Sequence, residues 1–198
     1  MIKVGLTGGM GSGKTTAARQ FEKLGIPVYY ADNRAKELMI KKDKIKEELI
    51  RTFGKEVYKN KRLDTKYLAS KVFNDKKELK KLENIVHPAV RKDFITWAKK
   101  QKSPYVIVEN AILHKSGMDK LMDYIIFVTA DKNTRIKRVK NRDGLTKKEI
   151  ENRMNNQENE DFFMNNSDFI IKNNENIDSL EKKVKMLDKK LKILLKKS

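Results

Sequence analysis

The sequence contains no cysteine among its 198 residues. A disulfide framework, a thiol nucleophile and a thiolate metal site are therefore excluded. It also contains no apolar run near the ~18 residues of a membrane-spanning helix, so we expect no membrane segment. A glycine-rich motif begins by residue 8 and leaves no room for a signal peptide. These absences fit a reducing compartment, and we expect a cytoplasmic protein.

Acidic residues are few relative to basic ones. The chain has 27 Asp and Glu against 46 Lys and Arg, which gives a formal net charge of +19 at pH 7. Such an excess is typical of nucleic-acid binders. The lysines, however, are scattered through most predicted helices and alternate with Glu and Asp, as on solvated helix faces. We therefore expect no nucleic-acid partner, with a nucleic-acid-binding protein as the alternative from a different class.

The most informative feature present is the pattern Gly8-x-x-x-x-Gly13-Lys14-Thr15, which follows an apolar run and precedes a predicted helix. This spacing is that of a phosphate-binding P-loop. Its four glycines are expected to provide backbone conformations that other residues avoid, so that N–H groups surround an anion at the helix N-terminus. Lys14 is predicted to reach the β- and γ-phosphates, and Thr15 to bind Mg²⁺. The predicted ATP site comprises Gly8, Gly9, Met10, Gly11, Ser12, Gly13, Lys14, Thr15 and Thr16, with ATP and Mg²⁺ as cofactors.

Short apolar runs alternate with helical patterns along the chain. Strands separated by helices predict an α/β fold with a doubly wound, parallel, five-stranded sheet of the P-loop NTPase type. Between the second and third strands, residues 33–100 show sustained helical periodicity and no convincing strand, which indicates a helical insertion. The predicted strands are 2–7, 28–31, 105–108, 124–128 and 168–171.

Two carboxylates follow predicted strands at the edge where ligands bind in such sheets. Asp32 could accept a proton from a substrate hydroxyl or bind Mg²⁺ through water, or it could cap the helix predicted to begin at Asn33. Glu109 could be the acidic residue of a Walker B-like strand, or could simply mark the end of its strand. We expect the P-loop, Asp32 and Glu109 to converge on one crevice.

Arginines surround a glycine between two predicted helices. This arrangement around Gly144 is similar to the lid of small P-loop kinases, in which arginine stabilises the charge of the transferred phosphoryl group. Arg138 and Arg142 are the predicted lid arginines, with exposed basic helices as the alternative. Arg135 and Arg153 are expected to be solvated or structural.

One histidine has two open interpretations. His87 precedes Pro88 and could hydrogen-bond a substrate phosphate or hydroxyl. It could equally end a helix that is broken before the proline.

Further short segments form a set that covers nearly the whole chain. They are Gly5–Thr15, Ala31-Asp32, Phe53-Gly54, Leu63-Asp64, Val72-Phe73, Leu82–Pro88, Glu109–Leu113, Arg138–Asp143, Arg153 with Gln157, and Ser167-Asp168. Together they resemble the dephospho-coenzyme A kinase family. The form of the P-loop and the His-Pro pair carry most of the specificity.

The resemblance implies a three-part kinase. A P-loop core of residues 1–32, 101–130 and 166–198 would hold ATP, an insertion at 33–100 would receive dephospho-CoA, and a lid at 131–165 would close over the phosphates. ATP would phosphorylate the ribose 3′-hydroxyl of dephospho-CoA. The catalytic residues would be Asp32, Lys14 and Arg142, the substrate residues Asp32, His87 and Glu109, and Arg138 and Arg142 would also bind ATP. The alternative in the same class is a nucleoside or nucleoside-monophosphate kinase.

Three positions depart from the family pattern. Tyr30 stands where the first aspartate of an Asp-Ala-Asp triplet is common, while the second aspartate is retained as Asp32. Lys36 replaces an arginine and lacks its planar pair of donors. Lys115 replaces an acidic residue, which removes any role for a carboxylate there.

Overall fold

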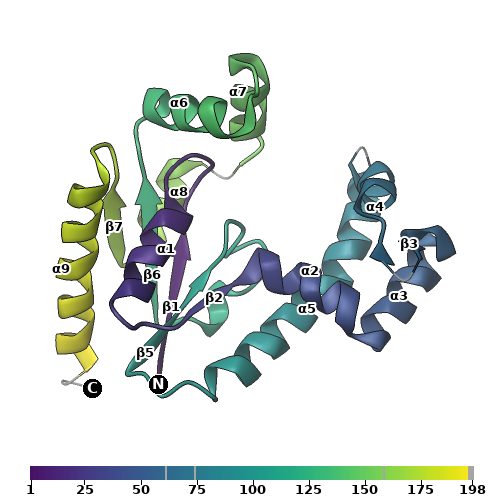
Figure 1. Cartoon of the computed structure of the whole chain (residues 1–198), viewed down its shortest axis with the longest axis horizontal. Helices are drawn as coiled ribbons and strands as arrows, with labels where there is room; N and C mark the ends of the chain where they lie inside the picture. The colour runs from purple at the N-terminus through teal and green to yellow at the C-terminus, as the bar shows by residue number, and fades with distance from the viewer. Residues whose placement is uncertain (61, 74, 158, 196–198) are drawn as a thin grey trace. The chain divides into compact units, whose positions relative to one another are not determined.

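The computed structural model describes residues 1–60, 62–73, 75–157 and 159–195. The chain forms two compact units (Figure 1), one from Met1–Tyr29 with Gln101–Ser198 and the other from Tyr30–Lys100. Across the described ranges, every helix is too short or too polar to cross a lipid bilayer.

A five-stranded sheet forms the first unit. Its order is β2-β5-β1-β6-β7, and β1 runs parallel to both β5 and β6, as β6 does to β7. The predicted α/β sheet is therefore confirmed, with strand ends shifted by a few residues. The strands are β1 Ile2–Thr7, β2 Val28–Tyr30, β5 Tyr105–Glu109, β6 Tyr124–Thr129 and β7 Phe169–Lys172.

Two helices cover one face of this sheet. Helix α1, Lys14–Lys23, packs on the sheet and against α9, Ile177–Leu195. Leu180, Val184, Leu187 and Leu191 recur at helical spacing along α9 and are buried. Beneath them, the Tyr105 hydroxyl donates to Asp188 Oδ1 at 2.7 Å. Burial raises the pKa of Tyr105 and the adjacent carboxylate raises it further.

Aromatic and aliphatic side chains cover the opposite face. Phe163 of α8, Glu160–Asn165, stacks on Phe127 of β6 with ring centroids 5.1 Å apart. Gly5 makes room for Leu113, because a Cβ at this position would lie 2.7 Å from the leucine side chain.

Helices α6, Lys132–Asp143, and α7, Lys147–Asn155, follow β6. Gly144 ends α6 with a φ of 68°, a conformation that glycine adopts without strain. Thr146 and Glu149 form a capping box at the start of α7. A small core joins the two helices and is built from Ile136, Val139 and Ile150, with Met10, Leu145 and Met154 packed on it.

The second unit is mostly helical, and one difference from the prediction lies in its strands. Residues 58–59 and 62–63 form a two-stranded antiparallel ribbon where no strand was expected. Strands of two residues are too short to produce a periodic signal. The elements are α2 Ala31–Lys41, α3 Asp43–Phe53, η1 Lys55–Val57, β3 Tyr58–Lys59, β4 Arg62–Leu63, α4 Thr65–Val72 and α5 Lys76–Ala98; in the first unit, η2 spans Asp119–Leu121.

Helix α5 continues through Pro88 to Ala98. The interpretation of His87 as the end of a helix is therefore wrong. Proline removes one backbone donor, but buried Val86, Val90 and Phe94 on either side hold the helix in place.

Candidate active site

The P-loop connects β1 to α1 with the backbone that anion binding requires. Gly11 and Gly13 have φ values of 78° and 90°, in the left-handed region that favours glycine. Helix α1 begins at Lys14, and its first turn is closed by the Ala17 N–H donating to the Gly13 carbonyl at 2.9 Å. The N-terminal N–H groups and the positive dipole end of α1 thus lie at the end of the loop.

The prediction that all four glycines serve backbone conformation is wrong for two of them. Gly8 and Gly9 are absent from the glycines with positive φ in the described chain. They provide space instead: a Cβ at Gly8 would lie 2.7 Å from Ser12 Oγ, and one at Gly9 would lie 2.5 Å from an Arg135 nitrogen.

Glu109 contacts two of the predicted ATP-site side chains. Its Oε1 lies 2.7 Å from Lys14 Nζ and accepts a hydrogen bond from Thr15 Oγ1 at 3.1 Å. The Glu109 side chain is 6% exposed and that of Lys14 13% exposed. A carboxylate this buried requires such partners. The predicted proximity of Glu109 to the P-loop is confirmed.

A cleft of about 310 Å³ lies over the P-loop. Arg142 reaches its rim from the far end of α6, which brings a predicted lid arginine to the same cleft as Lys14. The lining residues are Gly8, Gly9, Met10, Gly11, Gly13, Lys14, Thr15, Thr16, Ala111, Arg142 and Gln157.

Arg142 is paired with its neighbour in sequence. Its Nε and Nη2 donate to the two oxygens of Asp143 at 2.7 and 2.8 Å. These hydrogen bonds raise the pKa of Arg142 and lower that of Asp143. The Arg142 side chain is 66% exposed, so its guanidinium is charged and open to solvent.

The side chain of Arg138, on α6, lies close to Gly13 of the P-loop. Its Nη2 donates to the Glu175 carbonyl at 3.4 Å, and its Nη1 is buried with no hydrogen-bond partner in the described chain. A Cβ built on Gly13 would lie 3.8 Å from that Nη1. A buried donor of this kind needs a partner, and an anion on the P-loop would provide one.

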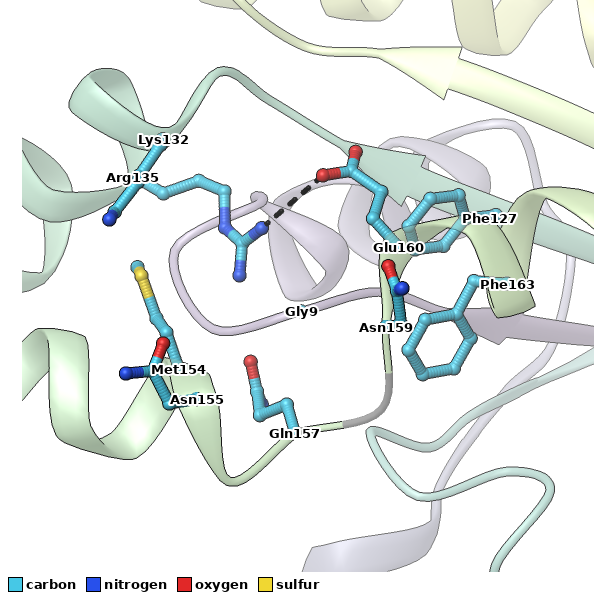
Figure 2. A pocket seen from close by; sticks show the side chains of 10 residues that line it. All are labelled: Gly9, Phe127, Lys132, Arg135, Met154, Asn155, Gln157, Asn159, Glu160 and Phe163. Atoms are coloured by element: carbon cyan, nitrogen blue, oxygen red, sulfur yellow. Dashed lines mark ion pairs between the residues drawn. The ribbon is translucent and has the colours of Figure 1, made fainter.

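A second cleft, of about 470 Å³, lies on the other side of Gly9 (Figure 2). Arg135 extends into it from α6 and forms an ion pair with Glu160, with Nη1 and Oε2 3.8 Å apart. Burial lowers the pKa of Arg135, and Glu160 counteracts part of that shift. Arg135 was predicted to be either solvated or structural. Its side chain is only 14% exposed, so it is a structural residue.

Three P-loop contacts were missed by the sequence reasoning. The Met10 carbonyl accepts from Arg135 Nε at 2.9 Å, and the Met10 N–H donates to Gln157 Oε1 at 2.9 Å. The Ser12 carbonyl accepts from Asn173 Nδ2 at 2.8 Å. Gln157 and Asn173 come from loops whose positions depend on tertiary packing, and neither belongs to a pattern that would predict the contact.

Asp32 and His87 belong to the second unit. Helix α2 begins at Ala31, so Asp32 lies exposed in its first turn and the predicted N-cap role is wrong. A carboxylate in the first turn still interacts favourably with the helix dipole. His87 is half-buried within α5.

Comparisons with known proteins identify the family. The model of the family described as dephospho-CoA kinase matches residues 2–179. The chain belongs to the dephospho-CoA kinase family. It is 38% identical over 160 residues to the dephospho-CoA kinase of Porphyromonas gingivalis, covering 81% of this chain and 79% of that one.

Solved structures agree with this family assignment. The dephospho-CoA kinase from Campylobacter jejuni superposes with a TM-score of 0.71 at 25% identity, covering 96% of both chains. The TT1252 protein from Thermus thermophilus gives a TM-score of 0.83 at 32% identity, covering 96% of this chain and 97% of that one. A shikimate kinase from Bacteroides thetaiotaomicron, at 17% identity and a TM-score of 0.59, shares the fold.

Proposed function

We propose that this protein transfers the γ-phosphoryl group of ATP to the ribose 3′-hydroxyl of dephospho-CoA, which gives CoA and ADP and completes CoA biosynthesis. The bond between the acceptor oxygen and the γ-phosphorus forms, the bond to the β-phosphate oxygen breaks, and the acceptor hydroxyl loses its proton. The observation that carries the proposal is the contact of the buried Glu109 with both Lys14 and Thr15 in a chain of this family.

Lys14 would move from Glu109 to the β- and γ-phosphates when ATP binds. Its flexible stem permits this shift, and the loop N–H groups bind the same phosphates. Because phosphoryl transfer spreads negative charge over the moving group, fixed positive groups stabilise the transition state more than the ground state.

Mg²⁺ fits the oxygen atoms beside Lys14. Thr15 Oγ1 and Glu109 Oε1 lie 3.1 Å apart, and Mg²⁺ in such sites takes one or two protein oxygens together with substrate phosphates. Thr15 would bind the ion directly and Glu109 would bind it through water. Held by these residues, Mg²⁺ would supply positive charge beside the phosphates.

Asp32 would orient the 3′-hydroxyl and accept its proton. An exposed carboxylate in the first turn of a helix is accessible to a substrate and can accept a hydrogen bond from its hydroxyl. Residues 33–100, with His87, would bind dephospho-CoA, as the family resemblance implies.

Residues 131–165 would form the lid over the phosphates. Arg142 and Arg138 would contact the triphosphate, with Arg142 exchanging its bond to Asp143 for one to the γ-phosphate. A cytoplasmic location stays a prediction of the sequence.

Incubation with MgATP and a panel of acceptors tests the function. We expect mass spectrometry to show one phosphate added to dephospho-CoA, and no phosphorylated product in reactions with an acceptor that lacks the 3′-hydroxyl. A higher kcat/KM for nucleosides or nucleoside monophosphates would favour the rival kinase. Salt-dependent duplex binding without turnover would favour the nucleic-acid-binding alternative.

A further inference from the structure

Side chains from three separate segments hold the P-loop backbone, and the proposed chemistry uses none of these contacts. Arg135 of α6 donates through Nε to the Met10 carbonyl at 2.9 Å. Gln157, after α7, accepts the Met10 N–H at 2.9 Å. Asn173, after β7, donates through Nδ2 to the Ser12 carbonyl at 2.8 Å.

The contacts to the two carbonyls determine where other atoms point. In a trans peptide, the carbonyl of one residue and the N–H of the next point in opposite directions within one rigid plane. Holding the Met10 carbonyl toward Arg135 therefore directs the Gly11 N–H away from Arg135. Likewise, holding the Ser12 carbonyl toward Asn173 directs the Gly13 N–H away from Asn173.

The remaining N–H groups of this stretch are used elsewhere. The Met10 N–H donates to Gln157, and the Ser12 N–H donates to the Gly9 carbonyl at 3.1 Å. Alternate N–H groups are thus engaged by the protein, while Gly11 and Gly13, both at positive φ, are oriented by their neighbours. Such alternation of conformation is how consecutive peptides form an anion-binding concavity.

Two glycines let these side chains approach the loop. A Cβ on Gly9 would lie 2.5 Å from Arg135 Nη2 and 3.3 Å from Gln157 Oε1. A Cβ on Gly13 would collide with Asn173 Nδ2. The absence of side chains at these two positions is therefore needed for the three contacts as well as for binding phosphate.

The supporting side chains are themselves firmly held. Asn173 is 6% exposed, and Arg135, with a side chain that is 14% exposed, is paired with Glu160. Figure 2 shows Arg135 and Gln157 directed at the loop around Gly9 from two sides. The Met10 side chain packs on the core between α6 and α7, which adds an apolar contact at the same residue.

We infer that Arg135 and Asn173 are positioning residues that orient the Gly11 and Gly13 N–H groups toward the phosphates before the nucleotide arrives, and that Gln157 supports them by holding the Met10 N–H. Preorganised donors bind and stabilise charge better than donors that must turn at the moment of binding. The inference rests on the proposed function only in that the ligand carries a polyphosphate.

Calorimetry with ADP tests two of these residues. Arg135→Lys keeps the charge but loses the planar Nε donor, and Asn173→Ala removes the Nδ2 donor. Since each loses one buried hydrogen bond that orients a phosphate donor, we expect each to weaken ADP binding about 10-fold. The matched control is Lys137→Ala, exposed on α6, which should bind ADP as the wild type does.

Amide NMR tests the mechanism directly, because a purely structural role would not single out two amides. In the nucleotide-free wild type, we expect one sharp resonance each for Gly11 and Gly13, and a large shift of both on addition of ADP. Asn173→Ala should broaden or split the Gly13 resonance, and Arg135→Lys that of Gly11. Wild-type ADP affinity together with unchanged glycine resonances in both variants would overturn the inference.

Full ADP affinity in Arg135→Lys alone would also overturn the role of Arg135, since charge without direction would then suffice. If Arg135→Lys does not fold, Asn173→Ala and Gln157→Met carry the same test on other contacts. ADP binding and NMR need no acceptor, so failure to phosphorylate dephospho-CoA would refute the proposed function and leave this inference standing.

Discussion

The charged side chains at the P-loop differ in exposure and in pairing from the charged side chain at the end of α6. Arg135 and Lys14 are 14% and 13% exposed, and each is held by a group from another segment. Arg142, two turns along the helix from Arg135, is 66% exposed and paired with the adjacent Asp143. Exposed ion pairs contribute about 0–1 kcal/mol, whereas breaking a buried pair is costly.

The difference separates two tasks within one site. Buried charges hold the loop in a conformation that already suits phosphate. An exposed arginine can exchange a weak partner for a ligand at little cost in stability. Removing a buried charge should therefore change both stability and activity, while removing an exposed one should change activity alone.

Lys14→Ala should have the largest effect. We expect kcat/KM to fall about 10⁴-fold because no other side chain of the loop supplies this charge. The melting temperature should also fall, since Glu109 loses its partner at 2.7 Å. Steady-state kinetics and thermal unfolding measure the two effects.

The double variant Lys14→Ala with Glu109→Gln separates the effect on activity from the effect on stability. It should regain the melting temperature and stay inactive. A single Lys14→Ala variant with wild-type turnover would contradict the assigned role of Lys14.

Asp32→Asn tests an exposed charge in the second unit. We expect kcat to fall about 10³-fold, as when a general base is removed, with ATP affinity and melting temperature nearly unchanged. Calorimetry with ATP and kinetics at saturating substrate measure the split. Asp43→Asn, in the first turn of the neighbouring helix α3, is the control; loss of folding in Asp32→Asn alone would favour a structural role.

Arg142→Ala should reduce kcat about 10²-fold and ATP affinity less, with no change in melting temperature. The exposed Lys140→Ala, in the same turn of α6, should be active. An unchanged kcat in Arg142→Ala would make Arg142 a solvated surface residue. A lower melting temperature would break the comparison between exposed and buried charges.

Tyr105→Phe extends the comparison to a buried side chain that lies away from the P-loop. Loss of the hydrogen bond to Asp188 should reduce the free energy of unfolding by about 1–2 kcal/mol and leave kcat unchanged. Denaturant titration measures the first quantity.

The pKa of Tyr105 determines the direction in which stability changes with pH. Folding raises the pKa of Tyr105 above its ordinary value of 10.0, so above about pH 10 the unfolded chain loses this proton while the folded chain keeps it. Stability should fall with rising pH in that range, and it should fall less steeply in Tyr105→Phe. Parallel slopes would mean that Tyr105 ionises equally in both states.

Local patterns predicted much of the fold. Short apolar runs predicted the strands of the sheet. Where periodicity was the only guide, the result was weaker, since the helical pattern of residues 33–100 gave no signal for the two-residue strands β3 and β4.

The candidate site was predicted in part for the same reason. The P-loop is contiguous in sequence, so its residues and their roles could be proposed together. The position of Glu109 near the P-loop followed from the rule that parallel strands end at one edge, and the structure adds its contacts with Lys14 and Thr15. The converging position of Asp32 and the roles of the lid arginines stay predictions.

The sequence by itself determined the α/β sheet, the P-loop and the family, because each depends on residues close together in the chain or on a pattern that recurs in order. Only the tertiary structure decided that Arg135, Gln157 and Asn173 reach the loop. Those contacts join residues 125 to 161 positions apart. Their hydrogen bonds require directions that packing sets and that no local spacing encodes.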